Sequence, residues 1–349
     1  MTNMHYTLTF NTAAVKYQLH SSFGALDSLI DPANSIIITD TDVAGLYPHL
    51  FTGHRTVIIP AGERNKTLET VQYITEQLLQ HQAHRKTFLV GIGGGTVTDI
   101  TGFVASIYMR GLPFGFVPTT LLGMVDAAIG GKNGVNMGLH KNLLGTITQP
   151  QFILYFPSFL ETLPIEEWSN GFAEVIKYAC IFDKELFEEL SDNNINYYQQ
   201  NREALTTLIS RCVDWKNKTV LEDEKESDKR KLLNFGHTAG HALETQYHIP
   251  HGHAVALGMI IACMVSEQVE GLDISVRKKL VALLQQYKLP TMISFDIEQV
   301  MNLLKMDKKR TTDTIDYIVL EGIGKAIIKN IQFDTIEKAL VSFKDAGNY

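Results

Sequence analysis

Short runs of β-branched apolar residues alternate with helical patterns through the first part of this 349-residue chain, and this alternation most restricts its possible folds. The runs predict strands at residues 35–39, 56–59, 87–92, 114–117 and 152–155. Apolar residues recur at helical spacing from Thr67 to His81, between the second and third runs. Strands joined by crossover helices pair in parallel, and uniformly apolar strands are covered on both faces of their sheet. The sequence therefore predicts a doubly wound, Rossmann-like α/β domain over residues 1–157.

Beyond residue 157 strand-like runs nearly vanish, and long amphipathic segments follow one another. These segments predict helices at residues 168–181, 203–220, 232–246 and 254–269. One late exception is a pair of β-rich runs, 315–320 and 327–331, whose intervening glycines predict a hairpin. We therefore expect a second, mainly helical domain over residues 158–349.

Charge and composition exclude several classes of protein. The 31 basic and 38 acidic side chains leave a formal charge of −7, which argues against a nucleic-acid partner. No stretch approaches the roughly 18 consecutive apolar residues of a membrane span, and the first residues lack the pattern of a secretory signal. Cys180, Cys212 and Cys263 are odd in number and far apart, as in reduced core thiols. We therefore expect a cytoplasmic protein without a membrane partner.

Three consecutive glycines, residues 93–95, directly follow the predicted strand ending at Ile92 and precede a helical stretch. A glycine loop at a helix N-terminus lets backbone N–H groups approach a phosphate, and the helix dipole adds attraction. The spacing does not fit the dinucleotide fingerprint G-x-G-x-x-G, because Thr96 stands where its third glycine belongs. A tight turn in which Thr96 and Asp99 form a capping box is the structural alternative.

Polar residues also follow the other predicted strands, at the edge where a doubly wound sheet binds its ligands. Each acidic residue there could instead cap a helix. Together with the glycine loop, these make four loops at one edge, which favours a nucleotide site. The residues concerned are Asp40, Asp42, Glu63, Lys66, Thr119 and Thr120.

The glycine-rich segment 126–142 lacks apolar periodicity, which is typical of a functional loop inside a compact domain. Lys132 and Lys141 in it could hold an anionic substrate, and Asp126 and Asn142 could bind its hydroxyl groups. Taken singly, each lysine could also be a solvated surface charge.

The predicted helical domain concentrates charged and metal-ligating residues. Glu174 and Lys177, three apart on one helix, lie in an apolar segment, where charged groups are paired, metal-bound or catalytic. Five of the 12 histidines fall between residues 237 and 253, which favours a metal, most simply Zn²⁺. Thr238 excludes the H-E-x-x-H protease motif. Spacing leaves open which of the five histidines are ligands.

The chain resembles the 3-dehydroquinate synthase family over roughly residues 35–310. The motifs that carry the resemblance occur in this order: PAGERNKT, GGGTVTD, MRG, VPTT, VDAAIGGKNGVN, KNLLGTITQP, GFAEVIKYA, KRKLLNFGHTAGHALE and HGHAVALGM. The resemblance implies an N-terminal NAD-binding domain, a helical metal-binding domain and an active site in the cleft between them. It also implies a homodimer that uses one divalent metal, Zn²⁺ first, with Co²⁺ as an alternative.

The resemblance assigns roles to individual positions. It makes Glu174, His237 and His251 the metal ligands and leaves His253 outside the set. The implied NAD contacts are Asp40, Asp42, Glu63, Lys66, Gly94, Gly95, Asp99, Thr119, Thr120, Lys132, Lys141 and Thr162. The implied catalytic and substrate contacts are Asp126, Lys132, Asn142, Lys177, Lys216, Arg230, Asn234 and His241, with Arg110 reaching across a dimer interface and Lys308 or Lys309 completing the phosphate pocket.

The reaction implied by the resemblance converts 3-deoxy-D-arabino-heptulosonate 7-phosphate into 3-dehydroquinate and phosphate, a step of the shikimate pathway of aromatic amino acid biosynthesis. Its implied steps are transient oxidation by NAD, β-elimination of phosphate, re-reduction and an intramolecular aldol closure at the metal. Lys132, Asn142 and Arg110 would bind the phosphate, and Lys216 and Arg230 the carboxylate. The enzyme would be a phosphate-eliminating lyase.

Three alternatives are compatible with the same motifs. An NAD- and metal-dependent polyol dehydrogenase of the glycerol type would have no need of the basic residues at 132, 216 and 230. Another sugar-phosphate cyclase, making a deoxy-inosose or a valiolone, would act on a substrate without the carboxylate that Arg230 implies. A non-catalytic binding protein would not require both a metal and a cofactor set.

Overall fold

The computed structural model describes residues 5–19, 23–138, 140–306 and 313–346. The chain forms two compact units, Met1–Pro164 with Asn201–Glu224 and Ile165–Gln200 with Lys225–Tyr349. The predicted domain boundary near residue 157 stays a prediction. The two units are not separated by a single boundary in the sequence, because the segment Asn201–Glu224 belongs to the first unit.

The first unit is built on a seven-stranded sheet in the order β1-β2-β9-β6-β5-β3-β4. All neighbours are parallel except β1 and β2. Strand bounds are β1 His5–Thr9, β2 Ala14–Leu19, β3 Ser35–Asp40, β4 Thr56–Ile59, β5 Phe88–Gly93, β6 Phe114–Pro118 and β9 Phe152–Tyr155. The five strands from β3 onward, read in chain order, have the order 2-1-3-4-5, which is a doubly wound topology.

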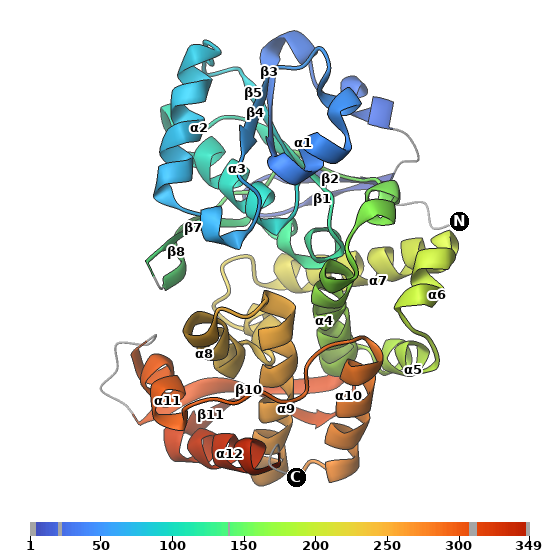
Figure 1. Cartoon of the computed structure of the whole chain (residues 1–349), viewed down its shortest axis with the longest axis vertical. Helices are drawn as coiled ribbons and strands as arrows, with labels where there is room; N and C mark the ends of the chain where they lie inside the picture. Colours follow the sequence, from blue (N-terminus) through green and yellow to red (C-terminus); the bar gives the residue numbers. More distant parts are fainter. Residues whose placement is uncertain (1–4, 20–22, 139, 307–312, 347–349) are drawn as a thin grey trace. The chain divides into compact units, whose positions relative to one another are not determined.

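Helices cover both faces of this sheet, as the apolar runs predict. Figure 1 shows α2 and α3 together on one face and α1 on the other. All five residues of β6 and all four of β9 are buried. The helices of the first unit are α1 Thr41–Leu46, α2 Leu68–Gln80, α3 Gly95–Ile107 and α7 Arg202–Glu222. The prediction of an α/β fold for this part of the chain is confirmed.

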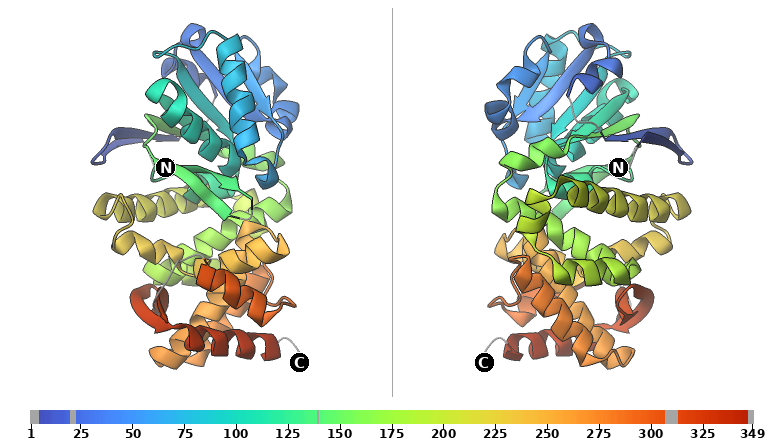
Figure 2. Two further views of the ribbon diagram at one scale, coloured as in Figure 1. Left: turned by 90° about the vertical axis from the view of Figure 1, so that its left-hand side faces the viewer. Right: turned by 90° about the vertical axis from the view of Figure 1, so that its right-hand side faces the viewer.

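Two hairpins of the first unit were not predicted from the sequence. Strands β1 and β2 form one, which Figure 2 shows in dark blue at the edge of the sheet. Strands β7 (Lys132–Met137) and β8 (His140–Ile147) form the other, where the sequence predicts a loop. Its strands are rich in glycine, asparagine and lysine, so they lack the apolar alternation by which a strand is recognised.

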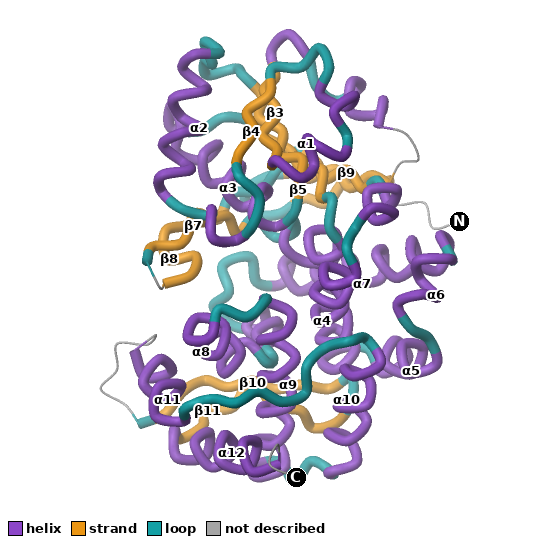
Figure 3. Tube along the Cα trace, in the orientation of Figure 1, coloured by secondary structure: helices purple, strands orange, loops and turns teal. Residues whose placement is uncertain are grey.

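The second unit is mainly helical, as predicted, and Figure 3 shows that the strands among its described residues form one hairpin. The helices are α4 Ile165–Phe182, α5 Lys184–Asp192, α6 Ile195–Gln200, α8 His237–Tyr247, α9 His251–Val269, α10 Ile274–Gln286, α11 Ile297–Met306 and α12 Phe333–Ala346. The hairpin pairs β10 (Thr314–Gly322) with β11 (Lys325–Gln332), and the predicted runs fall inside these strands.

The predicted helix over residues 232–246 is broken in the structure. A 3-10 turn, Lys229–Asn234, precedes α8, and Gly236 between them has φ +78°. A Cβ at Gly236 would come within 2.9 Å of the backbone O of Val255 and N of Met259. Glycine therefore lets the chain turn into α8 while lying against α9.

The helix α9 forms the centre of the second unit. Among the described residues it is the one helix long and apolar enough to cross a membrane, yet 78% of its most apolar window is buried. Such burial is also found in a core helix of a soluble protein. Residues 254–266 are all buried.

Candidate active site

The topology of the first unit places polar loops at one edge of its sheet. Chain order reverses between β3 and β5, and ligands bind outside the carboxyl ends of the strands at such a switch point. There β3 ends at Asp40 and β5 at Gly93. Asp40 is also the N-cap of α1, because its Oδ1 accepts hydrogen bonds from the N–H groups of Asp42 (3.1 Å) and Val43 (2.9 Å). Burial raises the pKa of Asp40, whereas Asp42 is exposed in the first turn of α1.

The glycine loop forms a helix N-terminus without a side-chain cap. Gly94 is the N-cap of α3, and no side chain caps it. The capping box expected as the alternative is therefore wrong, because Asp99 turns its carboxylate to Lys66 instead. The side chain of Thr120 lies beside Gly94, and Thr119 donates its N–H to the O of Gly93 at 2.9 Å. The N–H groups in the first turn of α3 have no partners within the helix, so they are suited to binding an anion.

Lys66 is the buried centre of a polar network that joins three of the predicted cofactor and substrate residues. It is only 4% exposed, forms an ion pair with Asp99, and donates from Nζ to Oδ1 of Asn142 at 2.6 Å. Burial raises the pKa of Asp99, and Lys66 opposes this shift only in part. Glu63 accepts hydrogen bonds from Thr96 (3.0 Å) and from Asn136 (2.9 Å).

Thr162, the last predicted NAD contact, lies in an aromatic corner of the first unit. Its hydroxyl lies 2.7 Å from the hydroxyl of Tyr47. Tyr47, Phe23, Phe156 and Phe159 also line a pocket there. This surface is therefore mainly aromatic, and the hydroxyl groups of Tyr47 and Thr162 lie beside it.

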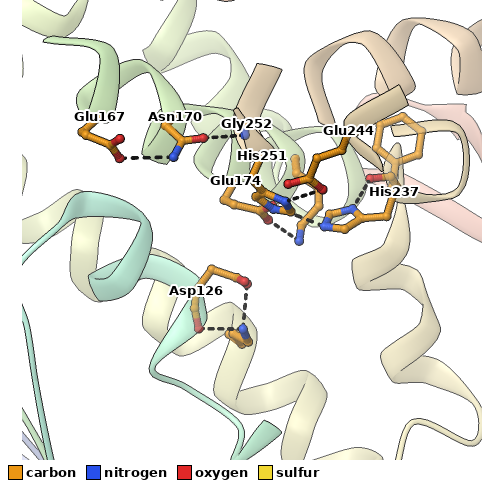
Figure 4. A network of polar contacts seen from close by, with 11 residues as sticks. Asp126, Glu167, Asn170, Glu174, His237, Glu244, His251 and Gly252 are labelled. Carbon is orange, nitrogen blue, oxygen red and sulfur yellow. Dashed lines mark hydrogen bonds and ion pairs between the residues drawn. The ribbon is translucent and has the colours of Figure 1, made fainter. Parts of the chain in front are cut away.

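Asp126 and Lys216 form a second ion pair of the first unit. The Nζ of Lys216 lies 2.7 Å from Oδ1 and 2.6 Å from the backbone O of Asp126. Figure 4 shows these two contacts at Asp126. Asp126 lies in a single π-helical turn, Gly123–Ala127, and π turns are frequent at functional sites.

The remaining predicted residues of the first unit lie at its surface. Lys132 and Lys141 stand at the start of β7 and β8, exposed and half-buried respectively. Arg110 is exposed in a turn where three successive residues have positive φ: Met109 (48°), Arg110 (70°) and Gly111 (125°).

The predicted metal ligands come together in the second unit. Glu174 is fully buried on α4, and its Oε1 lies 3.4 Å from Nε2 of His237 and 3.1 Å from Nε2 of His251. The three ligand atoms lie within 4.8 Å of one another. His237 and His251 are the first residues of α8 and α9, so three helices supply one donor each.

Lys177 and the histidines set the charge of this carboxylate. Burial raises the pKa of Glu174, but the ammonium of Lys177 and the ring of His237 hold it well below its ordinary value. Burial would also lower the pKa of His251, yet its hydrogen bonds to Glu174 and Glu244 raise it to about 10. The cluster therefore keeps an ionised oxygen donor facing two imidazole nitrogens.

These donors fit a divalent metal of the zinc type. One carboxylate oxygen with two imidazole nitrogens is a common catalytic donor set for Zn²⁺, with a further position for substrate. The Nδ1 of His237 lies 3.1 Å from the backbone O of Phe235, so a proton held there leaves Nε2 free of one. Of the other clustered histidines, His248 ends α8 in a left-handed conformation and His253 is half-buried, and neither is among the described groups that could hold a metal.

The other predicted substrate residues of the second unit are spread over two elements. Arg230 is 2% exposed in the 3-10 turn before α8. Asn234 donates from Nδ2 to Oε1 of Glu226 at 2.7 Å. His241 is exposed, with its ring centroid 5.1 Å from that of His237. Lys308 and Lys309 lie outside the described residues.

Three residues that contact the predicted ones were not predicted from the sequence. Asn136 binds Glu63, Glu244 contacts the ring of His251, and the Oδ1 of Asn170 accepts a hydrogen bond from the N–H of Gly252. Figure 4 shows Asn170 between Glu167 and Gly252, and Glu244 beside His251. Glu244 could have been predicted, because it follows His241 by three positions and so lies on the same helix face as His237 and His241.

Comparison with solved structures identifies the general class of this fold. The chain is similar to 2-epi-5-epi-valiolone synthase from Streptomyces hygroscopicus with NAD⁺ and Zn²⁺ bound, at 27% identity and a TM-score of 0.87, covering 97% of this chain and 98% of that chain. It is also similar to a 2-deoxy-scyllo-inosose synthase complexed with carbaglucose-6-phosphate, NAD⁺ and Co²⁺, at 25% identity and a TM-score of 0.85, covering 96% and 99%. The fold is therefore that of the sugar-phosphate cyclases.

The family follows from the sequence comparisons. Models described as "3-dehydroquinate synthase N-terminal" and "3-dehydroquinate synthase C-terminal" match residues 56–170 and 171–310. The chain is 41% identical to 3-dehydroquinate synthase of Pyrococcus furiosus over 338 residues, covering 93% of this chain and 98% of the relative. A Sulfurovum 3-dehydroquinate synthase is 37% identical over 346 residues, covering 96% and 97%. The chain belongs to the 3-dehydroquinate synthase family.

The contact between Gly252 and Asn170 predicts a loss of stability for Gly252→Ala. A Cβ at position 252 would meet the backbone O of Asn170 at 2.4 Å and its Oδ1 at 2.7 Å, so α9 would have to move away from α4. Overpacking of this kind costs about 1–3 kcal/mol, measured as the change in free energy of unfolding in urea. Gly45→Ala is the control, because nothing lies within 4 Å of that added methyl. Equal stability of Gly252→Ala and wild type would contradict the prediction.

Proposed function

We propose that this chain is a 3-dehydroquinate synthase that converts 3-deoxy-D-arabino-heptulosonate 7-phosphate into 3-dehydroquinate and phosphate. The observation that carries the proposal is the 41% identity to such a synthase across 93% of the chain. The donor set Glu174, His237 and His251 and the polar edge of the sheet supply the two kinds of site that the reaction needs. Its product places the enzyme in the shikimate pathway.

Glu174, His237 and His251 would hold one divalent ion, and the edge around Gly94, Gly95 and Asp99 would hold NAD. When bound, NAD supplies a reversible hydride acceptor and the ion a Lewis acid for substrate hydroxyl groups. Zn²⁺ and Co²⁺ both suit nitrogen and oxygen donors, and related cyclases carry these ions. Among the remaining NAD contacts that we propose are Asp40, Asp42, Glu63, Lys66, Thr119, Thr120, Lys132, Lys141 and Thr162.

The substrate carries a carboxylate and a phosphate, so the chain must present cations at two places. We assign the carboxylate to Lys216 and Arg230, and the phosphate to Lys132, Asn142 and Arg110, by charge-assisted hydrogen bonds. Asp126 orients Lys216 through two contacts, and Lys66 holds Asn142 through its Nζ. Lys177 keeps Glu174 ionised, while Asn234 and His241 would bind the sugar hydroxyls. The carbon–oxygen bond to phosphate breaks with loss of a neighbouring proton, a carbon–carbon bond closes the ring, and no net oxidation occurs.

We also propose a cytoplasmic homodimer. Support comes from β8, whose outward positions carry the apolar side chains Leu143 (57% exposed) and Ile147 (41% exposed). Met109 and Met137 of the same unit are also exposed. We propose that a second copy covers this part of the first unit, because contiguous exposed apolar patches mark interaction surfaces.

The first of three predictions from the proposed function concerns the reaction. Purified protein with NAD and Zn²⁺ should release phosphate from the heptulosonate phosphate and form dehydroquinate, because the hydride removed from the substrate is returned in each turnover. Phosphate release and absorbance at 340 nm are followed together, and the latter should show no net NADH. Steady NADH formation on glycerol without phosphate release would instead indicate a polyol dehydrogenase.

The second prediction separates His251 from His253. His251→Ala should bind metal more than about 100-fold more weakly, since even outer partners of a ligand contribute 10–100-fold. His253→Ala should keep its metal, because His253 is not in the donor cluster. Metal analysis after dialysis measures both, and the reverse pattern would show that the ligand assignment is wrong.

The third prediction concerns assembly. Leu143→Asp places a charge on the outward face of β8 and should shift the sedimenting species from dimer to monomer at micromolar concentration, because an unpaired charge in an interface is costly. Leu46→Asp is the matched control, since Leu46 is equally exposed (56%) but lies on α1. A dimer unaffected by Leu143→Asp would exclude β8 from the interface.

A further inference from the structure

The ring of His251 lies between two carboxylates. Its Nε2 is 3.1 Å from Oε1 of Glu174, and its Nδ1 is 3.4 Å from Oε2 of Glu244. Glu244 lies on α8, is 3% exposed, and approaches the ring from the side away from Glu174, as Figure 4 shows. Burial of a carboxylate is costly unless hydrogen bonds or opposite charges compensate for it, and the ring of His251 supplies one such contact to Glu244.

The second histidine of the donor set is held in the same way. His237 directs Nε2 to the same oxygen of Glu174 at 3.4 Å, and its Nδ1 lies 3.1 Å from the backbone O of Phe235. In both rings Nε2 faces Glu174 and Nδ1 faces an oxygen acceptor. An imidazole that donates its proton from Nδ1 keeps the Nε2 lone pair for a metal, and its orientation is fixed.

We propose that Glu244 is a positioning residue of the metal site, which accepts a hydrogen bond from Nδ1 of His251 and so fixes this ring to bind the ion through Nε2. The inference rests on the proposed donor set of Glu174, His237 and His251. Glu244 itself does not touch the ion.

A second arrangement of the same atoms competes with this role. His241, Glu244 and His251 also place one ligand atom each within 4.8 Å of the others, so an ion there would take Nδ1 of His251. His241 is exposed, however, whereas Glu174 is fully buried. The next residue, Gly252, is held to Asn170 on the helix that carries Glu174. The backbone therefore fixes His251 toward Glu174 and leaves Glu244 as the acceptor on its far side.

The test uses Glu244→Gln in the full-length protein, stripped of metal and titrated with Co²⁺ alone. Affinity is measured by competition with a chelator, stoichiometry by the break in the titration, and ligand geometry by the visible absorption of bound Co²⁺. We expect one ion per chain, a 10- to 100-fold weaker affinity and an altered spectrum, since loss of such a partner has effects of this size.

Glu267→Gln is the matched control. Glu267 also forms a polar pair, with Nε of Arg277 at 2.6 Å, but it lies 16 residues beyond His251 on α9, about 24 Å along the helix. This variant should keep the affinity and the spectrum of the wild type. If Glu244→Gln does not fold, Glu244→Asp replaces it and should weaken Co²⁺ binding without a change in thermal unfolding of the metal-free protein.

Two results would overturn the proposal. Unchanged affinity and spectrum in the folded Glu244 variant would show that the carboxylate does not position the ring. Two ions bound per wild-type chain, with one lost in Glu244→Gln, would make Glu244 a ligand. Failure of the donor set itself is distinguishable, because His251→Ala would then bind Co²⁺ as tightly as the wild type.

Discussion

The second unit depends on how it stabilises one buried carboxylate. Glu174 is completely inaccessible, and an isolated ionised group in such a place would instead take up a proton. Lys177 prevents this from one turn along α4, while His237 and His251 approach from the beginnings of two other helices. The charge can stay buried only while α4, α8 and α9 keep their mutual positions. The cluster is therefore both a packing constraint and a set of donors for a cation.

In the first unit the polar groups lie at the edge of the sheet, so they must be held in place without being fully buried. A buried ammonium, Lys66, joins Asp99 on α3 to Asn142 on β8. The loops beyond the strands are thus tied to each other before any ligand arrives. Holding groups rigid in advance lowers the cost of ordering them when a ligand binds. In both units a buried lysine fixes the position of side-chain oxygens. Lys177 does so for Glu174, and Lys66 does so for Asp99 and Asn142.

Much of this could be predicted from the sequence, and the limits have physical causes. Strands β3 to β6 were visible because each carries a run of apolar residues, and on β6 every residue of the run is buried. The hairpin β7–β8 was not, because its polar, glycine-rich strands carry no period of two. The metal-type cluster was visible as a histidine-rich segment, but which histidines converge on Glu174 depends on how three helices pack. Asn170 was missed because it acts across 82 positions through one backbone N–H.

The fold alone does not determine the reaction. An iron-containing alcohol dehydrogenase shares it at a TM-score of 0.64 and 15% identity, a likeness that concerns only the arrangement of the elements. Arg230 is 2% exposed, and a guanidinium so deeply buried requires compensation by acidic groups. A carboxylate-bearing substrate would give such a cation a binding role, whereas a neutral polyol would not.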